Sequence, residues 1–201
     1  MKTWDKFFPF VLPWAMGCPE PTAVFHIKQA AIDFLSTSRA WRKTLAGVPT
    51  AAGTRAYAFG QGAGAQVLSI EKCSIGTDDP LEIGFDEEVD GDDSLGVPTR
   101  IWTTDLANFN LWRTPAGVFS VVNDVVLTPT QAATGIDDGL FELYVKDIAS
   151  VALSTLLLPE HTWSNPQLAT FHGNKMGVAT NAAAVQAQTG GARLRMKRGP
   201  L

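Results

Sequence analysis

Apolar side chains near the start of the chain recur at helical spacing. They follow a three- and four-residue period through Val24, Ile27, Ala31, Phe34, Leu35 and Trp41. Prolines suit the positions at or before a first helical turn, as at Pro19 and Pro21, and Thr22 can serve as the cap. The pattern therefore predicts a helix over 22–43, which ends by the sequence Gly47-Val48-Pro49.

The period changes in the middle of the chain. Alternating apolar and polar residues predict short strands over 54–59, 66–75, 81–85, 100–104, 108–113 and 118–127. Turn residues separate them, first at Gly60-Gln61-Gly62-Ala63-Gly64 and later at Asp90-Gly91-Asp92, Gly96-Val97-Pro98 and Pro115-Ala116-Gly117. Links this short favour antiparallel pairing.

Helical spacing returns in the last third. One helix is predicted to have Asp137 or Asp138 as its cap and to stop at Pro159, and another to cover 166–188, ended by Gly190-Gly191. The last helix carries a strip of small residues, Ala169, Gly173, Gly177 and Ala184. We expect this strip to pack on the preceding helix, and leucine at Gly177 then to cost about 1–3 kcal/mol.

These elements predict an α+β fold. A helical bundle would form from the N- and C-terminal helices, and an antiparallel β-rich sub-domain would be inserted into it. The expected division is 1–50 for the N-terminal helix, 51–135 for the inserted β sub-domain, 136–190 for the C-terminal helices and 191–201 for a basic tail. Hydrophobic residues make up 45% of the 201 residues, enough to build a core.

Charge is distributed unevenly along the chain. Nine acids and no basic residue lie between Thr77 and Asp93, whereas the end carries only basic residues, Arg193, Arg195, Lys197 and Arg198. Two solvated loops would explain this pattern, and so would contacts with copies of the chain or with other proteins. We single out Asp86, Glu87, Glu88 and Asp90 as an acidic patch at the surface, and the basic end as a docking tail.

No catalytic or metal-binding pattern stands out, and we expect neither an enzyme nor a cofactor. The glycines at 60–64 lead into a predicted strand instead of opening a helix, as a phosphate loop requires. A calcium loop counted from Asp86 has Val97 where a glutamate is needed. The histidines His26, His161 and His172 lack metal-ligand spacing, and two cysteines, Cys18 and Cys73, fit free thiols in a reducing compartment.

The first residues faintly resemble a lipoprotein signal that ends at Cys18. Asp5, Pro9 and Pro13 argue against that interpretation, because they place a charge and two breaks in the region that should be apolar. No other stretch approaches the ~20 apolar residues that a membrane span needs, so we expect no membrane contact.

Two segments resemble the head-to-tail adaptor (connector) proteins of tailed phages. The first begins at Trp4 and contains LPWAMGCPEPTAVFHIKQAAIDFLSTSRAWR, a proline-flanked cysteine that leads into a helix ending in an aromatic residue and arginine. The second begins at Ala149 and reads ASVALSTLLLPEHTWSNPQLATFHGNKMGVATNAA, a small-residue helix, a proline turn and an alanine-rich helix. The β segment between them matches only by arrangement.

The resemblance implies a virion structural protein of the neck, assembled in the host cytoplasm. It implies a homo-oligomeric ring of twelve subunits, bound to the portal protein above and to a tail or nozzle protein below, with transient contact to passing DNA. The segment 190–201 would reach the portal, and the acidic patch, Asp86, Glu87, Glu88 and Asp90, would face the DNA channel or a tail component. A tail-completion or head-decoration protein is the main alternative, and a small ligand-binding domain or enzyme is a weaker one.

Overall fold

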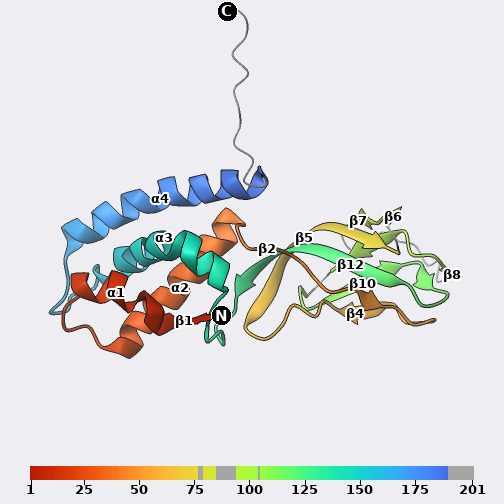
Figure 1. Ribbon diagram of the computed structural model, residues 1–201, viewed down its shortest axis with the longest axis horizontal. Helices are drawn as coiled ribbons and strands as arrows, with labels where there is room; N and C mark the ends of the chain where they lie inside the picture. The colour runs from red at the N-terminus through yellow and green to blue at the C-terminus, as the bar shows by residue number, and fades with distance from the viewer. Residues whose placement is uncertain (77–78, 85–93, 104, 190–201) are drawn as a thin grey trace, which may run out of the picture. The chain divides into compact units, whose positions relative to one another are not determined.

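The computed structural model describes residues 1–76, 79–84, 94–103 and 105–189 (Figure 1). The chain divides into two compact units. One combines Met1–Ala40 with Ile136–Leu201, and the other is Trp41–Gly135. We call them the helical unit and the β unit and describe each by itself.

The helical unit begins with short elements and continues with long helices. The short ones are β1 (Lys2–Thr3), which pairs with β13 (Gly135–Ile136), and then η1 (Trp4–Phe7), α1 (Phe8–Val11) and η2 (Leu12–Trp14). The long helices are α2 (Glu20–Ser38), α3 (Asp138–Leu156) and α4 (Pro166–Gln188). α3 packs against both α2 and α4, and Figure 1 shows α4 running along α3.

The end of α2 differs from the sequence prediction. The helix stops at Ser38, and Arg39 takes a left-handed conformation with φ 53°. The backbone N–H of Arg39 donates a hydrogen bond to the carbonyl of Leu35. A left-handed residue satisfies the last free carbonyls of a helix and turns the chain away. Trp41, predicted on the helical stripe, instead packs against the core of the β unit.

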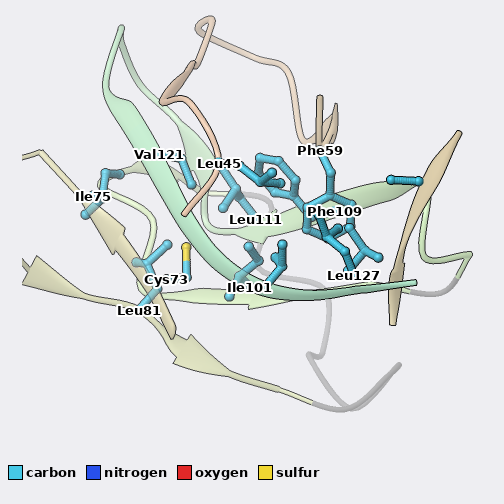
Figure 2. Close-up of a cluster of buried hydrophobic side chains, with 13 residues drawn as sticks. Leu45, Phe59, Cys73, Ile75, Leu81, Ile101, Phe109, Leu111, Val121 and Leu127 are labelled. Carbon is cyan, nitrogen blue, oxygen red and sulfur yellow. The ribbon is translucent and has the colours of Figure 1, made fainter. Parts of the chain in front are cut away.

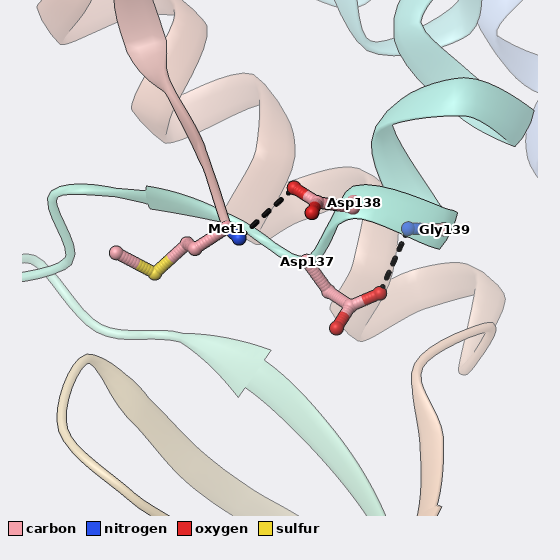
Figure 3. A network of polar contacts seen from close by, with 4 residues as sticks. All are labelled: Met1, Asp137, Asp138 and Gly139. Atoms are coloured by element: carbon pink, nitrogen blue, oxygen red, sulfur yellow. Dashed lines mark hydrogen bonds and ion pairs between the residues drawn. The ribbon is translucent and has the colours of Figure 1, made fainter.

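The start of α3 confirms Asp137 as the cap. Its carboxylate accepts a hydrogen bond from the Gly139 backbone N–H at 2.9 Å, and the amino group of Met1 lies 2.9 Å from the Asp138 carboxylate (Figure 3). This ammonium group, as a hydrogen-bond donor, lowers the pKa of Asp138. Both carboxylates stand where the positive end of the helix dipole favours negative charge.

Large apolar side chains fill the helical unit. Phe7, Ile27, Phe34, Leu35, Ile148 and Leu153 are fully buried. The Phe7 ring meets Phe141 edge-on at 5.0 Å between centroids, a preferred geometry for aromatic pairs. The core thus joins the first elements of the chain to α3.

The β unit contains two main sheets and one small one. In the first, the order is β2 (Arg42–Thr44), β12 (Ser120–Pro129), β5 (Ala65–Ile75) and β6 (Asp79–Pro80), and β3 (Val48–Pro49) also pairs with β12. In the second, the order is β4 (Ala56–Ala58), β10 (Asn108–Trp112), β9 (Arg100–Trp102) and β7 (Glu82–Ile83). The small sheet pairs β11 (Thr114–Pro115) with β8 (Leu95–Gly96). Pairing is antiparallel except for β7 with β9 and β11 with β8.

Both main sheets contribute to one hydrophobic core (Figure 2). Phe109 and Leu111 of β10 and Ile101 of β9 alternate with outward residues, as a pleated strand requires. The buried residues of this core are Leu45, Phe59, Ala65, Val67, Cys73, Ile75, Leu81, Ile101, Phe109, Leu111, Val121, Val125 and Leu127. Sheet-forming residues therefore build a core of their own.

The predicted fold class, a helical bundle with an inserted β sub-domain, is wrong. The chain is mixed α/β with strands dominant, since the described residues form thirteen strands and only four α-helices, one of them a single turn. The strands make a unit with its own core, not a flap on a bundle. α4 buries only four of its 23 residues, and it contacts α3 more extensively than α2.

Among the described residues, none of the helices combines the length and the hydropathy that crossing a bilayer would require.

Candidate interaction surface on the last helix

The outer face of α4 carries a row of large apolar side chains. Phe171, Val178 and Val185 are 52%, 73% and 54% exposed and stand seven residues apart. Seven residues make nearly two helical turns, so the three side chains lie on one stripe that drifts by only about 20° per step. We call Phe171, Val178 and Val185 the apolar row.

The helix that carries this row is almost free of charge. Lys175 is the single charged residue in its sequence. Exposed helices normally carry charged side chains on the solvent face, and depletion of charge is typical of the core of a protein interface. The composition of α4 therefore suits contact with another protein.

A groove of about 740 Å³ lies beside the apolar row, between α3 and α4. Leu143, 63% exposed, lines its α3 side, and Phe171 and Val178 line its α4 side. Lys146, Asp147 and Lys175 give it a charged border. A neighbouring side chain can thus reach apolar surface and polar partners in one place.

Polar contacts hold α3 to its neighbours. Ser150 and the Nδ1 atom of His172 lie 2.8 Å apart across the α3–α4 contact, and the Nδ1 atom of His26 lies 3.0 Å from the Thr155 hydroxyl across the α2–α3 contact. Burial lowers the pKa of both histidines, and nearby Lys175 lowers that of His172 further. Burial in the groove raises the pKa of Asp147.

We expect these histidines to make the helical unit sensitive to acid. A histidine whose pKa is lowered on folding takes up its proton more readily in the unfolded chain, so its contribution is intact above the ordinary value of about 6.5 and is lost as the pH falls below it. We expect the melting temperature to fall as the pH is lowered from 7.5 to 5.5. Each histidine should lower the free energy of unfolding by at most about 1.4 kcal/mol per pH unit.

Calorimetry of the wild-type chain and the His172→Asn variant checks this expectation. Asn retains a polar group near Ser150 but does not titrate, so its acid sensitivity should be smaller. The raised pKa of Asp147 has the opposite effect, because the folded state holds that proton more readily and so gains stability as the pH falls. Equal acid sensitivity in both proteins would contradict the assignment to His172.

The small-residue strip occupies several environments. Ala169 is buried, Ala184 is half-buried, and a Cβ added to Gly173 would lie 3.9 Å from the Ser154 Cβ. A Cβ added to Gly177 would meet nothing within 4 Å. The residues of α4 that are buried are Ala169, His172, Thr180 and Ala183, and Gly177 therefore lies off the packing face.

This placement reverses the expectation for Gly177→Leu. The leucine has open space, and it favours a helix more than glycine does, so stability should stay level or rise by up to about 1 kcal/mol. Ala169→Leu serves as the contrast, because overpacking at that buried site should cost about 1–3 kcal/mol. Urea unfolding of both variants measures the difference, and a large loss at Gly177 would contradict it.

The two charged candidates lie outside the described residues. These are the acidic patch, Asp86, Glu87, Glu88 and Asp90, and the docking tail, Arg193, Arg195, Lys197 and Arg198. Their proposed contacts stay predictions.

Side chains that could bind a metal or act in catalysis are scattered in the part of the chain that the structure describes. There, no group of three or more metal-ligating residues comes together. Burial raises the pKa of the Cys73 thiol to about 12, which keeps it protonated at neutral pH. Ser150 and His172 touch, but the Nε2 atom of His172 is buried and has no hydrogen-bond partner among the described residues.

The apolar row was not predicted from the sequence. The spacing of Phe171, Val178 and Val185 is visible in the sequence, but the same spacing also describes a buried stripe.

Comparison with known proteins adds no assignment: no protein-family model and no curated protein matches the chain.

Proposed function

We propose that this protein is a structural virion subunit, a head-to-tail adaptor whose copies assemble into a ring beneath the portal. The observation that supports assembly is the apolar row on a nearly uncharged helix. A row of three large apolar side chains along one stripe of a helix offers apolar surface against which a neighbouring helix can pack. The adaptor assignment itself rests on the resemblance of the two segments that begin at Trp4 and Ala149.

Contact along the apolar row would also stabilise α4, which packs weakly within its own unit. With four buried residues it gains little from its own unit, and its glycines lower helix propensity. Burial of Phe171, Val178 and Val185 against a neighbouring subunit would stabilise the helix, because apolar area removed from water contributes about 25 cal/mol per Å².

Val178→Asp tests the assembly surface. At 73% exposure the aspartate should change the stability of the subunit by no more than about 0.5 kcal/mol, yet it places a charge in the middle of the row. Native mass spectrometry of the wild-type chain should show a ring, with twelve copies expected, and the variant should be monomeric.

Val118→Asp is the matched control. Val118 is 78% exposed and lies in the β unit, so the same change there should leave the oligomer intact. A wild-type chain that stays monomeric at every concentration, or a Val178→Asp variant that still assembles, would contradict the proposal. Binding to tail or capsid components instead of portal would favour the tail-completion or head-decoration alternative.

A further inference from the structure

The turn that joins α3 to α4 exposes one large apolar side chain and one acid. We call residues 158–164 the α3–α4 turn. Leu158 is 58% exposed, and Glu160, two residues later, is also exposed. Glu160 is the only acid in the sequence of this turn, which holds no lysine or arginine. The turn therefore offers an apolar anchor beside a single negative charge.

Hydrogen bonds tie the α3–α4 turn to the end of α3. The backbone N–H of Asn165 and the hydroxyl of Ser164 both donate to the carbonyl of Leu157, at 3.0 and 3.2 Å. The rings of His161 and Trp163 stack with 4.6 Å between their centroids. A loop that is ordered before it binds loses little conformational freedom on binding, so this turn suits a docking element.

The groove beside the apolar row offers a complementary surface. Its apolar part is formed by Leu143, Phe171 and Val178, and the exposed side chains of Lys146 and Lys175 border it. The Lys175 ammonium lies 4.8 Å from the centre of the Phe171 ring, which places a positive charge next to apolar surface. Neither lysine forms an ion pair within the described part of the chain.

One acid, Asp147, is among the described residues that line the groove, and it does not balance the two lysines. Its side chain is half-buried, and burial raises its pKa, although nearby Lys175 opposes that shift. A raised pKa means that the surroundings disfavour the negative form of the carboxyl group. The groove therefore carries a surplus of positive charge, whereas the α3–α4 turn is negative.

The groove lies along the helices and not at the turn. On α3 its lining runs from Leu143 to Ser150, which stand 13 and six residues before Leu156, the last residue of the helix. At 1.5 Å per residue these separations are about 20 and 9 Å of helix. Because the turn is tied to the Leu157 carbonyl, it cannot fold back into its own groove. An occupant of this chemistry would have to come from another chain.

We infer that the α3–α4 turn of one copy docks in the groove of the next copy. Leu158 would contact the apolar part of the groove, and Glu160 would face its lysines, an arrangement that fixes the orientation of the contact. The turn and the groove are different surfaces of one subunit, so the contact is head-to-tail, and contacts of this kind close into rings where the rotation allows. The inference rests on the proposed function and specifies which segment meets the surface beside the apolar row.

Native mass spectrometry of the full chain tests the docking. Leu158→Asp should raise the concentration at which the ring forms by at least about tenfold. Because Leu158 is largely exposed, this variant should keep the fold, and a thermal melt verifies that. Glu160→Lys should weaken assembly several-fold at low salt and less at high salt, because salt screens exposed charges. Asp33→Lys, which reverses an exposed acid on α2, is the control and should leave the ring intact.

A mixture of two defective variants distinguishes a head-to-tail contact from a two-fold one. Leu158→Asp keeps an intact groove, and Val178→Asp keeps an intact turn. At a concentration at which each variant alone is monomeric, the mixture should form heterodimers and nothing larger, because a single intact contact remains between the two chains. A two-fold contact, which needs both surfaces on both chains, would give no such heterodimer.

The outcomes separate this inference from the proposed function. A wild-type ring together with Leu158→Asp that assembles equally well would overturn the inference and leave the proposed function standing. Absence of the heterodimer, or equal weakening by Glu160→Lys and Asp33→Lys, would also overturn the inference alone. A wild-type chain that stays monomeric at every concentration would overturn both.

Discussion

Replacing Phe109 with alanine should lower the free energy of unfolding by about 3–5 kcal/mol. Phe109 is completely buried on the inner side of β10, where its ring stacks on Tyr57 at 5.7 Å and meets Phe59 at 5.1 Å. The substitution removes a large apolar surface and leaves a cavity between the main sheets, whose neighbours can collapse only in part.

Urea unfolding followed by circular dichroism measures this effect. Val118→Ala is the control, because its 78% exposed side chain should contribute less than about 0.5 kcal/mol. A loss below about 1 kcal/mol at Phe109 would show that the β unit repacks around the cavity, against the close packing seen in protein interiors.

Local signals made parts of the helical unit predictable. α4 spans Pro166–Gln188, as expected, and Asn165 caps it by accepting a hydrogen bond from the Leu168 backbone N–H at 3.1 Å. Proline at the first position and a capping side chain before it act within one turn, so no tertiary information is needed. The same holds for Asp137 at the start of α3.

The end of α2 depended on contacts that a sequence does not show. No glycine or proline marks Arg39, and the apolar spacing continues to Trp41. The side chain of Trp41 packs against the β core and its carbonyl accepts a hydrogen bond from Leu127 at 2.7 Å. Tertiary packing therefore overrode a helical pattern that was locally consistent.

The candidate surfaces were hidden for a related reason. Periodicity shows which residues share a face, but not which face meets a neighbour. On α4, His172, Thr180 and Ala183 face inward and Val178 faces outward, although valine is the more apolar residue. The groove beside the apolar row needs the packing of α4 on α3, which brings Leu143 to one side of it and which neither helix specifies alone.

Helix α3 is the element on which the helical unit depends most. Ten of its 19 residues are buried, against four of the 23 in α4, and it contacts both α2 and α4. A defect in α3 therefore disturbs two packing faces at once, whereas a defect in the outer face of α4 disturbs none within the subunit.

Ile148→Asp is accordingly expected to destabilise the chain by about 3–5 kcal/mol or to prevent folding, because a fully buried carboxylate without a partner must be desolvated. Leu143→Asp on the same helix is the control. At 63% exposure it keeps its aspartate in water, and repulsion from Asp147 four residues away should cost only about 0.2–0.5 kcal/mol. Thermal and urea unfolding of the two variants, compared at pH 7.5, decide the matter. Similar losses of stability in both variants would mean that the Leu143 side of α3 is buried in solution. That would be the case if another subunit already filled the groove beside the apolar row. Native mass spectrometry of Leu143→Asp would then show the ring dissociated.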